Sequence, residues 1–278
     1  MSLQWYPGHM TKARRELAEL MPSQDVVIEV LDARLPLASS NPLIAELRAG
    51  KPCVKVLTRS DLADPTVTVA WLAHLRVDGE VVALASTNAK PDLARRAITS
   101  ACERLGGRRA PDRPVRALIT GVPNVGKSTL LNTLVGRPVA KVGDKPAVTK
   151  GQQKVALRQG MLVTDSPGLM WPKVEDERAA FRLAFAGSIP DTAIDYLTIA
   201  MFGAEALLTR YPERVVARYK LAATPRSPEA LLTEVGRRRG GLRPGGVVDL
   251  HKAAEVLVHE FRAGVMGPIS LEDPPAAA

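Results

Sequence analysis

Cysteine is scarce in this chain of 278 residues, with Cys53 and Cys102 as its two examples. They lie far apart and lack the spacing of metal ligands, which excludes a disulfide framework and indicates a reducing compartment. The chain also lacks a run of about 18 apolar residues, the length that a membrane span needs. Its opening residues, MSLQWYPGHM, contain no apolar signal-peptide core. We therefore expect a cytoplasmic protein with no stable membrane association.

Basic residues outnumber acidic ones. The 38 Lys and Arg against 29 Asp and Glu give a formal net charge of +9. This balance favours a polyanionic partner, with nucleic acid first and an anionic membrane surface second. A soluble protein that is merely basic is the alternative. The hydrophobic fraction of 46% is enough to form the core of one large domain or of two smaller ones.

Apolar runs and helical patterns alternate in the first part of the chain. Runs at 25–32, 53–57, 81–86, 115–121 and 161–165 predict buried strands, and 41–50 and 91–107 predict helices. This alternation is typical of an α/β fold whose mostly parallel sheet is covered on both faces. Beyond residue 175 the patterns are helical, the last running from Asp249 to Gly264. We predict domains of residues 1–174 and 175–278, the second all-helical, and a frayed tail at 272–278.

A phosphate-binding loop is predicted at GVPNVGKST, which matches the pattern G-x-x-x-x-G-K-[ST] from Gly121 to Ser128. The glycines let the backbone turn tightly and point N–H groups at phosphate oxygens. Lys127 would place a cation on the β- and γ-phosphates, and Ser128 would offer a hydroxyl to Mg²⁺. An apolar strand enters this loop and a helix leaves it, so the context fits. The candidate nucleotide-binding residues here are Asn124, Val125, Gly126, Lys127, Ser128 and Thr129.

A second phosphate-site motif, DSPG, follows an apolar strand about 40 residues further on, as expected if the two strands are neighbours in one sheet. Asp165 would hold Mg²⁺ through water, and the Gly168 N–H would bond to a γ-phosphate. Between the two motifs lies the polar segment 141–153, where Thr149 is the candidate switch threonine that completes the Mg²⁺ shell. The alternative is that Thr149 is an ordinary surface-loop threonine.

The stretch VLTRSDL precedes the phosphate loop and ends a predicted strand with Asp61. A carboxylate there could accept hydrogen bonds from both N1–H and the 2-amino group of guanine, a donor pair that adenine lacks. ALAST, at the end of the next strand, would supply backbone N–H groups to the guanine oxygen near Ser86 and Thr87. The alternative is that a strand-end Asp serves only as a cap or turn residue.

Taken together, the motif order TRSD, AST, GVPNVGKS, Thr149 and DSPG resembles that of the circularly permuted GTPases. WYPGHMTKARREL, LDARLPLASSNP, GVPNVGKSTLLN, DSPGLMWPK and YPERVVARY resemble the YlqF/RbgA family, ribosome biogenesis GTPase A, along nearly the whole chain. The resemblance implies a P-loop Ras-like sheet with a moved chain entry, so that the base-recognition half is translated first. It also implies GTP and GDP as ligands, together with Mg²⁺.

This chain departs from the family at the base site, where the usual pattern is N-K-x-D. Asp61 is retained, but Thr58 replaces the Asn that braces the loop. Arg59 can still lay its stem over the base as a Lys would. We therefore expect GTP to be bound with looser affinity.

The residue after DSPG is Leu169, where many GTPases place a Gln that orients the attacking water. The resemblance implies that the catalytic group comes from elsewhere, and it points to His9, acting with Lys127 and Thr149. A structural or merely exposed histidine is the alternative for His9. Asn124 is a candidate K⁺ ligand near the β–γ bridge, with loop bracing as the alternative.

Three segments are basic, at 11–17, 108–116 and 236–243. A charge run is often only a solvated face, but Gly-flanked arginines before a helix suit phosphate contacts on structured RNA. The resemblance implies that the helical domain and the N-terminal arm dock on rRNA of the large ribosomal subunit precursor in a GTP-dependent way. We expect a monomeric GTPase of large-subunit assembly. The alternative is a GTP-gated RNA-binding module in which hydrolysis is incidental.

Overall fold

The computed structural model describes residues 8–76, 80–107, 113–140, 153–157, 160–171 and 176–276, and the side chains from residue 11 onward. Six strands form one sheet in the order β3-β2-β1-β4-β6-β5. They are β1 (Val26–Asp32), β2 (Cys53–Thr58), β3 (Val81–Ala85), β4 (Val115–Thr120), β5 (Gln153–Leu157) and β6 (Met161–Asp165). All neighbours are parallel except β5, which is antiparallel to β6. The predicted α/β class and its mostly parallel sheet are confirmed, and β5 is an additional edge strand.

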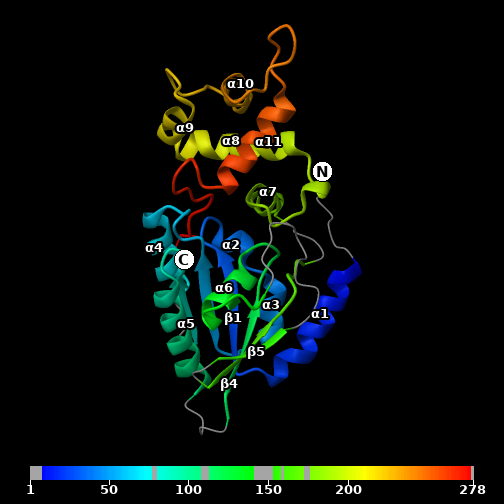
Figure 1. The fold of residues 1–278 in the computed structure, drawn as a ribbon, viewed down its shortest axis with the longest axis vertical. Coiled ribbons are helices and arrows are strands. Elements are labelled where there is room, and N and C mark those ends of the chain that lie inside the picture. The colour runs from blue at the N-terminus through cyan, green and yellow to red at the C-terminus, as the bar shows by residue number, and fades with distance from the viewer. Residues whose placement is uncertain are drawn as a thin grey trace.

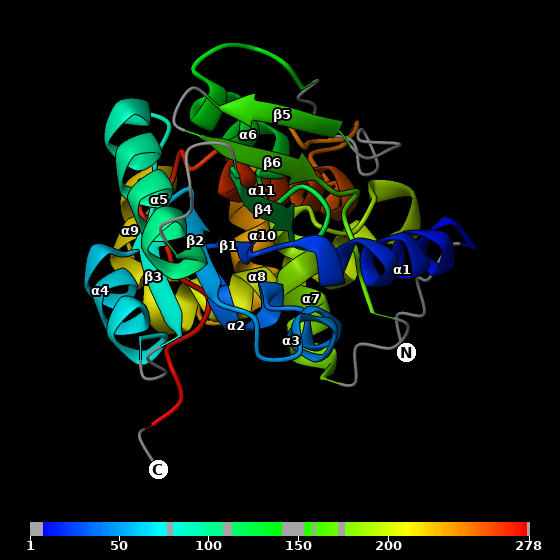
Figure 2. The same ribbon diagram turned by 90° about the horizontal axis from the view of Figure 1, so that it is seen from below.

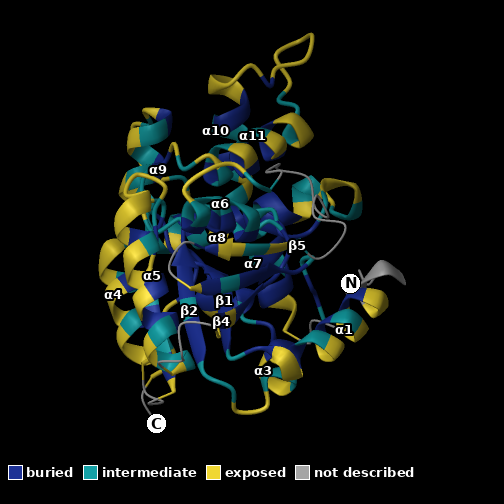
Figure 3. Cartoon of the chain, turned by 60° about the horizontal axis from the view of Figure 1, so that its bottom comes forward, coloured by how far each residue is buried: buried dark blue, intermediate teal, exposed yellow. Residues whose placement is uncertain are grey.

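Helices cover both faces of the sheet (Figure 2), because alternate side chains of the strands point to opposite sides. Val27, Cys53 and Leu118 pack into a cluster with Leu17 of α1 (Gly8–Leu20) and residues of α3 (Pro42–Arg48). The other face packs against α5 (Pro91–Gly106) and α6 (Lys127–Val135). The short α2 (Pro36–Ser39) follows β1, and α4 (Pro65–His74) packs beside β3. The strands β1, β2, β4 and β6 are accordingly mostly buried, whereas the outer surfaces of α4 and α5 are exposed (Figure 3).

The remaining helices gather beyond the carboxyl ends of the parallel strands (Figure 1). They are α7 (Glu177–Ala186), α8 (Tyr196–Arg210), α9 (Pro212–Tyr219), α10 (Pro228–Arg238) and α11 (Leu250–Arg262). A short 3-10 turn at Asp191–Ala193 lies between α7 and α8, and another at Met21–Ser23 follows α1. The helical patterns predicted after residue 175 are therefore helices. None of the described helices is both long and apolar enough to cross a bilayer.

The hydrophobic core is continuous from the sheet into these helices. One cluster contains Val30 and Leu35 from the sheet region as well as Phe185 and Phe261, whose rings stack with centroids 4.3 Å apart. At Gly203 of α8 a Cβ would overlap the Phe185 ring, so glycine is what allows α7 and α8 to approach this closely. The division into domains 1–174 and 175–278 stays a prediction.

The prediction of a frayed tail is wrong for its first two residues. Glu272 is 5% exposed, and its carboxylate accepts hydrogen bonds from the backbone N–H groups of Leu37 and Ala38. Asp273 forms a bidentate ion pair with Arg210 at 2.7 Å for both contacts. A run of prolines and alanines follows these two acidic residues, and that composition is what suggested a frayed tail.

Candidate nucleotide-binding site

The loops after β2 and β4 touch each other, although they are far apart in the sequence. Thr58 Oγ1 lies 2.6 Å from the Val125 carbonyl oxygen and 2.9 Å from that of Leu31. A hydroxyl has one proton, so Thr58 donates to one of these carbonyls at a time. Arg59 Nη2 donates to the Asn124 carbonyl at 2.7 Å. The loop that carries Asp61 and the predicted phosphate loop are thus joined side by side by hydrogen bonds.

This contact follows from the sheet topology. The strand order runs outward in one direction from β1 and in the other from β4, which are neighbours. In open α/β sheets such a switch point leaves a crevice at the carboxyl ends of the two strands, where ligands bind. Asp32 ends β1 and the phosphate loop follows β4, so both lie at this crevice.

The phosphate loop is shaped by unusual backbone angles. Asn124 and Gly126 adopt positive φ values of 57° and 103°, and α6 begins directly afterwards at Lys127. The N-terminus of α6, which contains Ser128 and Thr129, therefore points its N–H groups into the loop, as anion sites do. Lys127 is 6% exposed and its Nζ donates to the Val122 carbonyl at 2.7 Å. Burial lowers the pKa of Lys127 to about 8.

Asp165 lies beside this loop, because β6 pairs with β4 and places Asp165 opposite Ile119. It is fully buried, and among the described residues neither carboxylate oxygen has a partner of good hydrogen-bond geometry. Burial raises the pKa of Asp165 to about 6, against the opposing effects of Lys127 and Ser128. A buried carboxylate beside a serine hydroxyl supplies the kind of oxygen ligands that suit Mg²⁺.

Gly168 packs against the phosphate loop so closely that a Cβ there would lie 2.8 Å from Pro123 Cα and 3.1 Å from Lys127 Nζ. The backbone N–H of the next residue, Leu169, donates to the Gly121 carbonyl at 3.2 Å. Its side chain is 1% exposed and lies in the cluster formed with α1 and α3. Leu169 is therefore a core residue with no group to orient water.

Two predicted catalytic residues cannot be placed in this geometry. Thr149 lies outside the described residues. The backbone of His9 lies in α1, but its side chain is outside the described part.

The base-reading loop leaves Asp61 exposed and available to a ligand. Ser60 is held by two hydrogen bonds to the Ser86 carbonyl, from its N–H at 3.2 Å and from its Oγ at 3.0 Å. The Ser86 N–H donates to the Leu57 carbonyl at 2.8 Å, so this amide is already hydrogen-bonded to β2. A backbone donor to guanine near Ser86 must therefore come from a later residue, such as Thr87.

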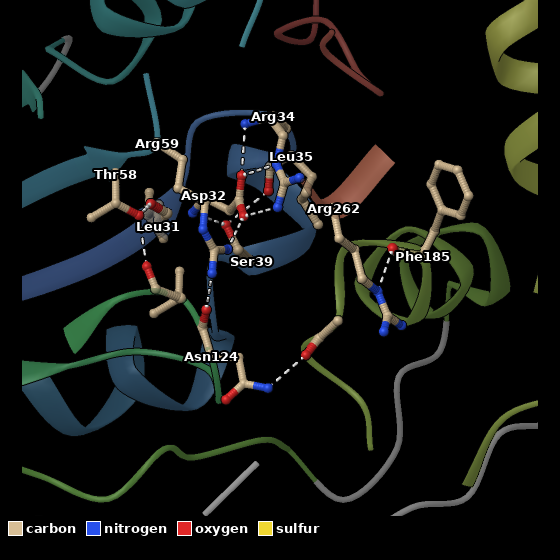
Figure 4. A network of polar contacts seen from close by, with 12 residues as sticks. Leu31, Asp32, Arg34, Leu35, Ser39, Thr58, Arg59, Asn124, Phe185 and Arg262 are labelled. Atoms are coloured by element: carbon tan, nitrogen blue, oxygen red, sulfur yellow. Dashed lines mark hydrogen bonds and ion pairs between the residues drawn. The ribbon is translucent and has the colours of Figure 1, made fainter. Parts of the chain in front are cut away.

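Asp32 and Arg34 form a buried ion pair where β1 ends, and no motif in the sequence assigned them a role. The Asp32 carboxylate accepts from Arg34 Nε at 2.9 Å, Arg34 Nη2 at 2.8 Å and Arg59 Nη1 at 2.7 Å (Figure 4). Asp32 and Arg34 are each 1% exposed. Burial alone would raise the pKa of Asp32, but the guanidinium groups of Arg34 and Arg59 hold it well below its usual range. The signal was an acid and an arginine two residues apart at a strand end, in LDARLP.

The phosphate loop also contacts the helical part of the chain. Asn124 Nδ2 donates to the Gly187 carbonyl at 2.8 Å, just after α7 ends (Figure 4). Arg262 of α11 holds the same end of α7 through the carbonyls of Phe185 and Ala184, at 3.1 and 2.8 Å. The Asn124 side chain therefore braces the loop, and its K⁺ role stays a prediction.

Comparisons with known proteins agree with this geometry. A family described as "50S ribosome-binding GTPase" matches residues 116–206. Ribosome biogenesis GTPase A of Bacillus licheniformis is 40% identical over 280 residues, covering 99% of both chains. A GDP-bound structure of TM YlqF has a TM-score of 0.67 at 27% identity and covers 94% of this chain and 99% of that one. The GNP-bound YlqF of T. maritima has a TM-score of 0.65 at 26% identity, with coverages of 95% and 98%.

Proposed function

Because this chain belongs to the ribosome biogenesis GTPase A family and is a guanine nucleotide-binding GTPase with circularly permuted motifs, we propose that it hydrolyses GTP while docked on rRNA of the large ribosomal subunit precursor. The observation that carries the nucleotide part is the contact between the two loops, through Thr58 and Arg59. We propose that it acts as a monomer in the cytoplasm.

Each end of the crevice has a role in binding GTP. Asp61 accepts from the guanine edge, with Arg59 and Thr58 holding its loop against the phosphate loop. Lys127 and the N-terminus of α6 bind the β- and γ-phosphates. Ser128, and Asp165 through water, would hold Mg²⁺, which would neutralise charge on the phosphates.

The group that orients the attacking water must be supplied by a residue other than Leu169, which is buried. We propose His9 for this role and Thr149 for completing the Mg²⁺ shell in the GTP state. His9 belongs to the helix whose Leu17 lies in the same hydrophobic cluster as Leu169. The proposal for His9 is tested by its alanine variant, described in the Discussion.

A cationic hollow between α9 and α10 supports docking on RNA. It has a volume of about 420 Å³ and is lined by Arg218, Tyr219, Lys220, Arg238 and Arg239. Glu260 pairs with Arg218 at 2.7 Å and with Arg239 at 3.1 Å. Lys220 and Arg238 are exposed at the rim. Cations of this kind on a helical surface suit contacts with phosphate oxygens.

Sedimentation with large-subunit particles tests this function. We expect the protein to sediment with the particles when a non-hydrolysable GTP analogue is bound and less so with GDP. Replacing Lys220 and Arg238 with Gln should weaken binding and reduce the salt dependence by roughly one counterion per lost phosphate contact. The matched control replaces Arg96 and Arg104, which are exposed on α5, and so removes the same charge from another surface.

The alternative, a GTP-gated RNA-binding module, makes a different prediction in the same experiment. Particles would then bind in the GTP state without stimulating hydrolysis. Equal binding with GDP and the GTP analogue, or an equal loss in the α5 control, would refute the proposed docking.

A further inference from the structure

The chain returns from α11 to the base-reading loop through a short extended segment, residues 269–273, which we call the C-terminal strap. The N–H of Ile269 donates to the backbone carbonyl of Leu62 at 2.8 Å, and the N–H of Leu271 donates to the backbone carbonyl of Arg34 at 2.7 Å. Ile269 and Ser270 are 2% and 0% exposed. Alternate residues of the strap are thus hydrogen-bonded to the two loops that follow β2 and β1.

The strap contacts the residues immediately after Asp61. Besides the Ile269 bond to Leu62, the Asp64 N–H donates to Ser270 Oγ at 3.1 Å. The Tyr211 hydroxyl accepts from the Ser270 N–H at 3.1 Å and donates to Asp64 Oδ2 at 3.3 Å. The Leu62 side chain packs on Gly264, where a Cβ would lie 2.5 Å from Leu62 Cδ2.

The strap is also anchored to elements on both sides of it. Arg210, at the end of α8, bonds to the Ser270 carbonyl at 3.0 Å and to the Asp273 carboxylate. Glu272 accepts from the first turn of α2, and its carbonyl accepts from Trp71 Nε1 at 3.2 Å. Because the strap is held at these points, a change in its position would also move the loop after β2, which it contacts.

Asp61 lies between two fixed neighbours. Ser60 is held by the Ser86 carbonyl, and Leu62 is held by Ile269 of the strap and by its own N–H bond to Arg59 at 2.9 Å. Asp61 itself is exposed and has its carboxylate free of the core. The backbone on each side therefore sets the point and direction from which the Asp61 side chain leaves the loop, and one of the two sides is held by the strap.

We propose that the C-terminal strap positions Asp61 for guanine, so that Ser270, Tyr211 and Ile269 determine nucleotide affinity and base selectivity without contacting the nucleotide. This inference rests on the proposed role of Asp61. Since the strap is continuous with α11, the position of the helical part and the occupancy of the guanine site are coupled. Coupling of this kind is reciprocal, so nucleotide binding also stabilises the strap.

A double-mutant cycle between Ser270→Ala and Asp61→Ala tests the inference, with dissociation constants for GDP and IDP as the readout. IDP lacks the 2-amino group that Asp61 accepts from. In the wild-type background Ser270→Ala should weaken GDP binding by roughly 3- to 10-fold, the effect of one lost hydrogen bond. It should weaken IDP binding less, because IDP offers Asp61 one donor fewer. In the Asp61→Ala background the same change should have no effect, because residues that act through one another are not additive.

The control is Ser227→Ala, which removes the N-cap hydroxyl of α10. It should lower the melting temperature without changing GDP affinity. Unchanged GDP affinity in Ser270→Ala, or an equal loss in both backgrounds, would overturn the inference. If Asp61→Ala itself leaves GDP affinity intact, the proposed role of Asp61 fails instead.

Hydrogen exchange on the wild-type protein gives a test that needs no variant. The amides of Ile269 and Leu271 should exchange roughly 3- to 10-fold more slowly when GDP saturates the site, the reciprocal of the coupling above. Amides in α10, which packs against α8, α9 and α11, serve as the internal reference. Equal exchange of the strap with and without GDP would contradict the proposal.

Discussion

Replacing Asp32 with asparagine removes the negative charge that lies between two guanidinium groups in the crevice. Oδ1 accepts from Arg34 Nε at 2.9 Å and from the Arg34 N–H at 3.0 Å, while Oδ2 accepts from Arg34 Nη2 at 2.8 Å and Arg59 Nη1 at 2.7 Å. An asparagine keeps one acceptor and turns an NH₂ donor toward a guanidinium. Arg34 is 1% exposed, so water cannot replace the lost carboxylate.

The expected loss is set mainly by Arg34. Breaking a buried ion pair costs about 3–5 kcal/mol, because it leaves an uncompensated charge in the interior. Arg34 would retain its 3.5 Å contact with the Phe261 carbonyl and its position 4.8 Å from the Phe261 ring. The Arg59 pair adds little, since the Arg59 side chain is 32% exposed and solvent screens it.

Urea unfolding of Asp32→Asn measures this loss. The control is Asp92→Asn, which breaks a pair with Arg95 whose aspartate is 70% exposed, and which should change the free energy of unfolding by less than about 0.5 kcal/mol. A fall of less than about 1 kcal/mol for Asp32→Asn would refute the reasoning, because it would mean that Arg34 tolerates burial without its partner.

The pH dependence has a definite sign. The folded pKa of Asp32 lies below its ordinary value of 3.8, so its stabilisation is fully present above that pH. It is lost as the pH falls from there toward the folded pKa. Below about pH 4 the wild type should lose stability faster than Asp32→Asn, which has no carboxylate to protonate at this position.

Four further predictions concern the nucleotide site. Gly168→Ala should weaken Mg²⁺–GTP binding by at least about 10-fold, because its Cβ would overlap Pro123, whose backbone cannot yield easily. Nucleotide titration measures this loss of affinity, and an affinity equal to that of the wild type would contradict the packing described. The affinity for Mg²⁺–GDP should be greatest between about pH 6 and pH 8, since Mg²⁺ needs the Asp165 carboxylate, whose pKa is raised to about 6, and the phosphates need the Lys127 ammonium, whose pKa is lowered to about 8. Asp165→Asn should reduce the acidic limb to the part that the terminal phosphate of GDP contributes and keep the basic limb, and an acidic limb of unchanged size would assign it to another group. His9→Ala should lower particle-stimulated turnover far more than GTP affinity, and unchanged turnover would remove His9 from the mechanism. If Asn124 is a K⁺ ligand, turnover should be faster in K⁺ than in Na⁺ at equal ionic strength; equal rates would leave it the bracing role alone.

The sheet could be predicted from the sequence because its strands are buried runs of apolar residues. Of the elements that were not predicted, which include α1 and α2, two have a physical reason that the structure shows. In β5, at the sheet edge, exposed residues alternate with partly buried ones, and the strand has five residues. In α4 the residues Thr66, Val67, Thr68 and Val69 favour a strand. The helix forms because Asp64 accepts from the N–H groups of Thr66 and Val67, and Pro65 opens the first turn.

The residues of the candidate site that belong to sequence motifs could be predicted. Lys127, Ser128, Asp165 and Asp61 belong to patterns whose chemistry is tied to local spacing. Arg34 has no such pattern, since its contact with Phe261 joins residues separated by 227 positions. The strap escaped for the same reason, because nothing local to residues 269–273 reveals that they pack against Leu62 and Asp64.

The permuted order explains why the helical part contacts both ends of the nucleotide crevice. The strand that carries Asp165 is followed by α7, whose terminal Gly187 receives Asn124 of the phosphate loop. The chain then runs through the helices and returns as the strap to the residues beside Asp61. The helices are thereby held at the phosphate end and at the base end by separate contacts. A displacement of the helices that kept one of these groups of contacts and broke the other would tilt the phosphate loop against the loop after β2. The contacts of Thr58 and Arg59, which join these two loops, would resist that tilt. Nucleotide binding across both loops should therefore favour one position of the helices, and the cationic hollow on α9 and α10 would move with them.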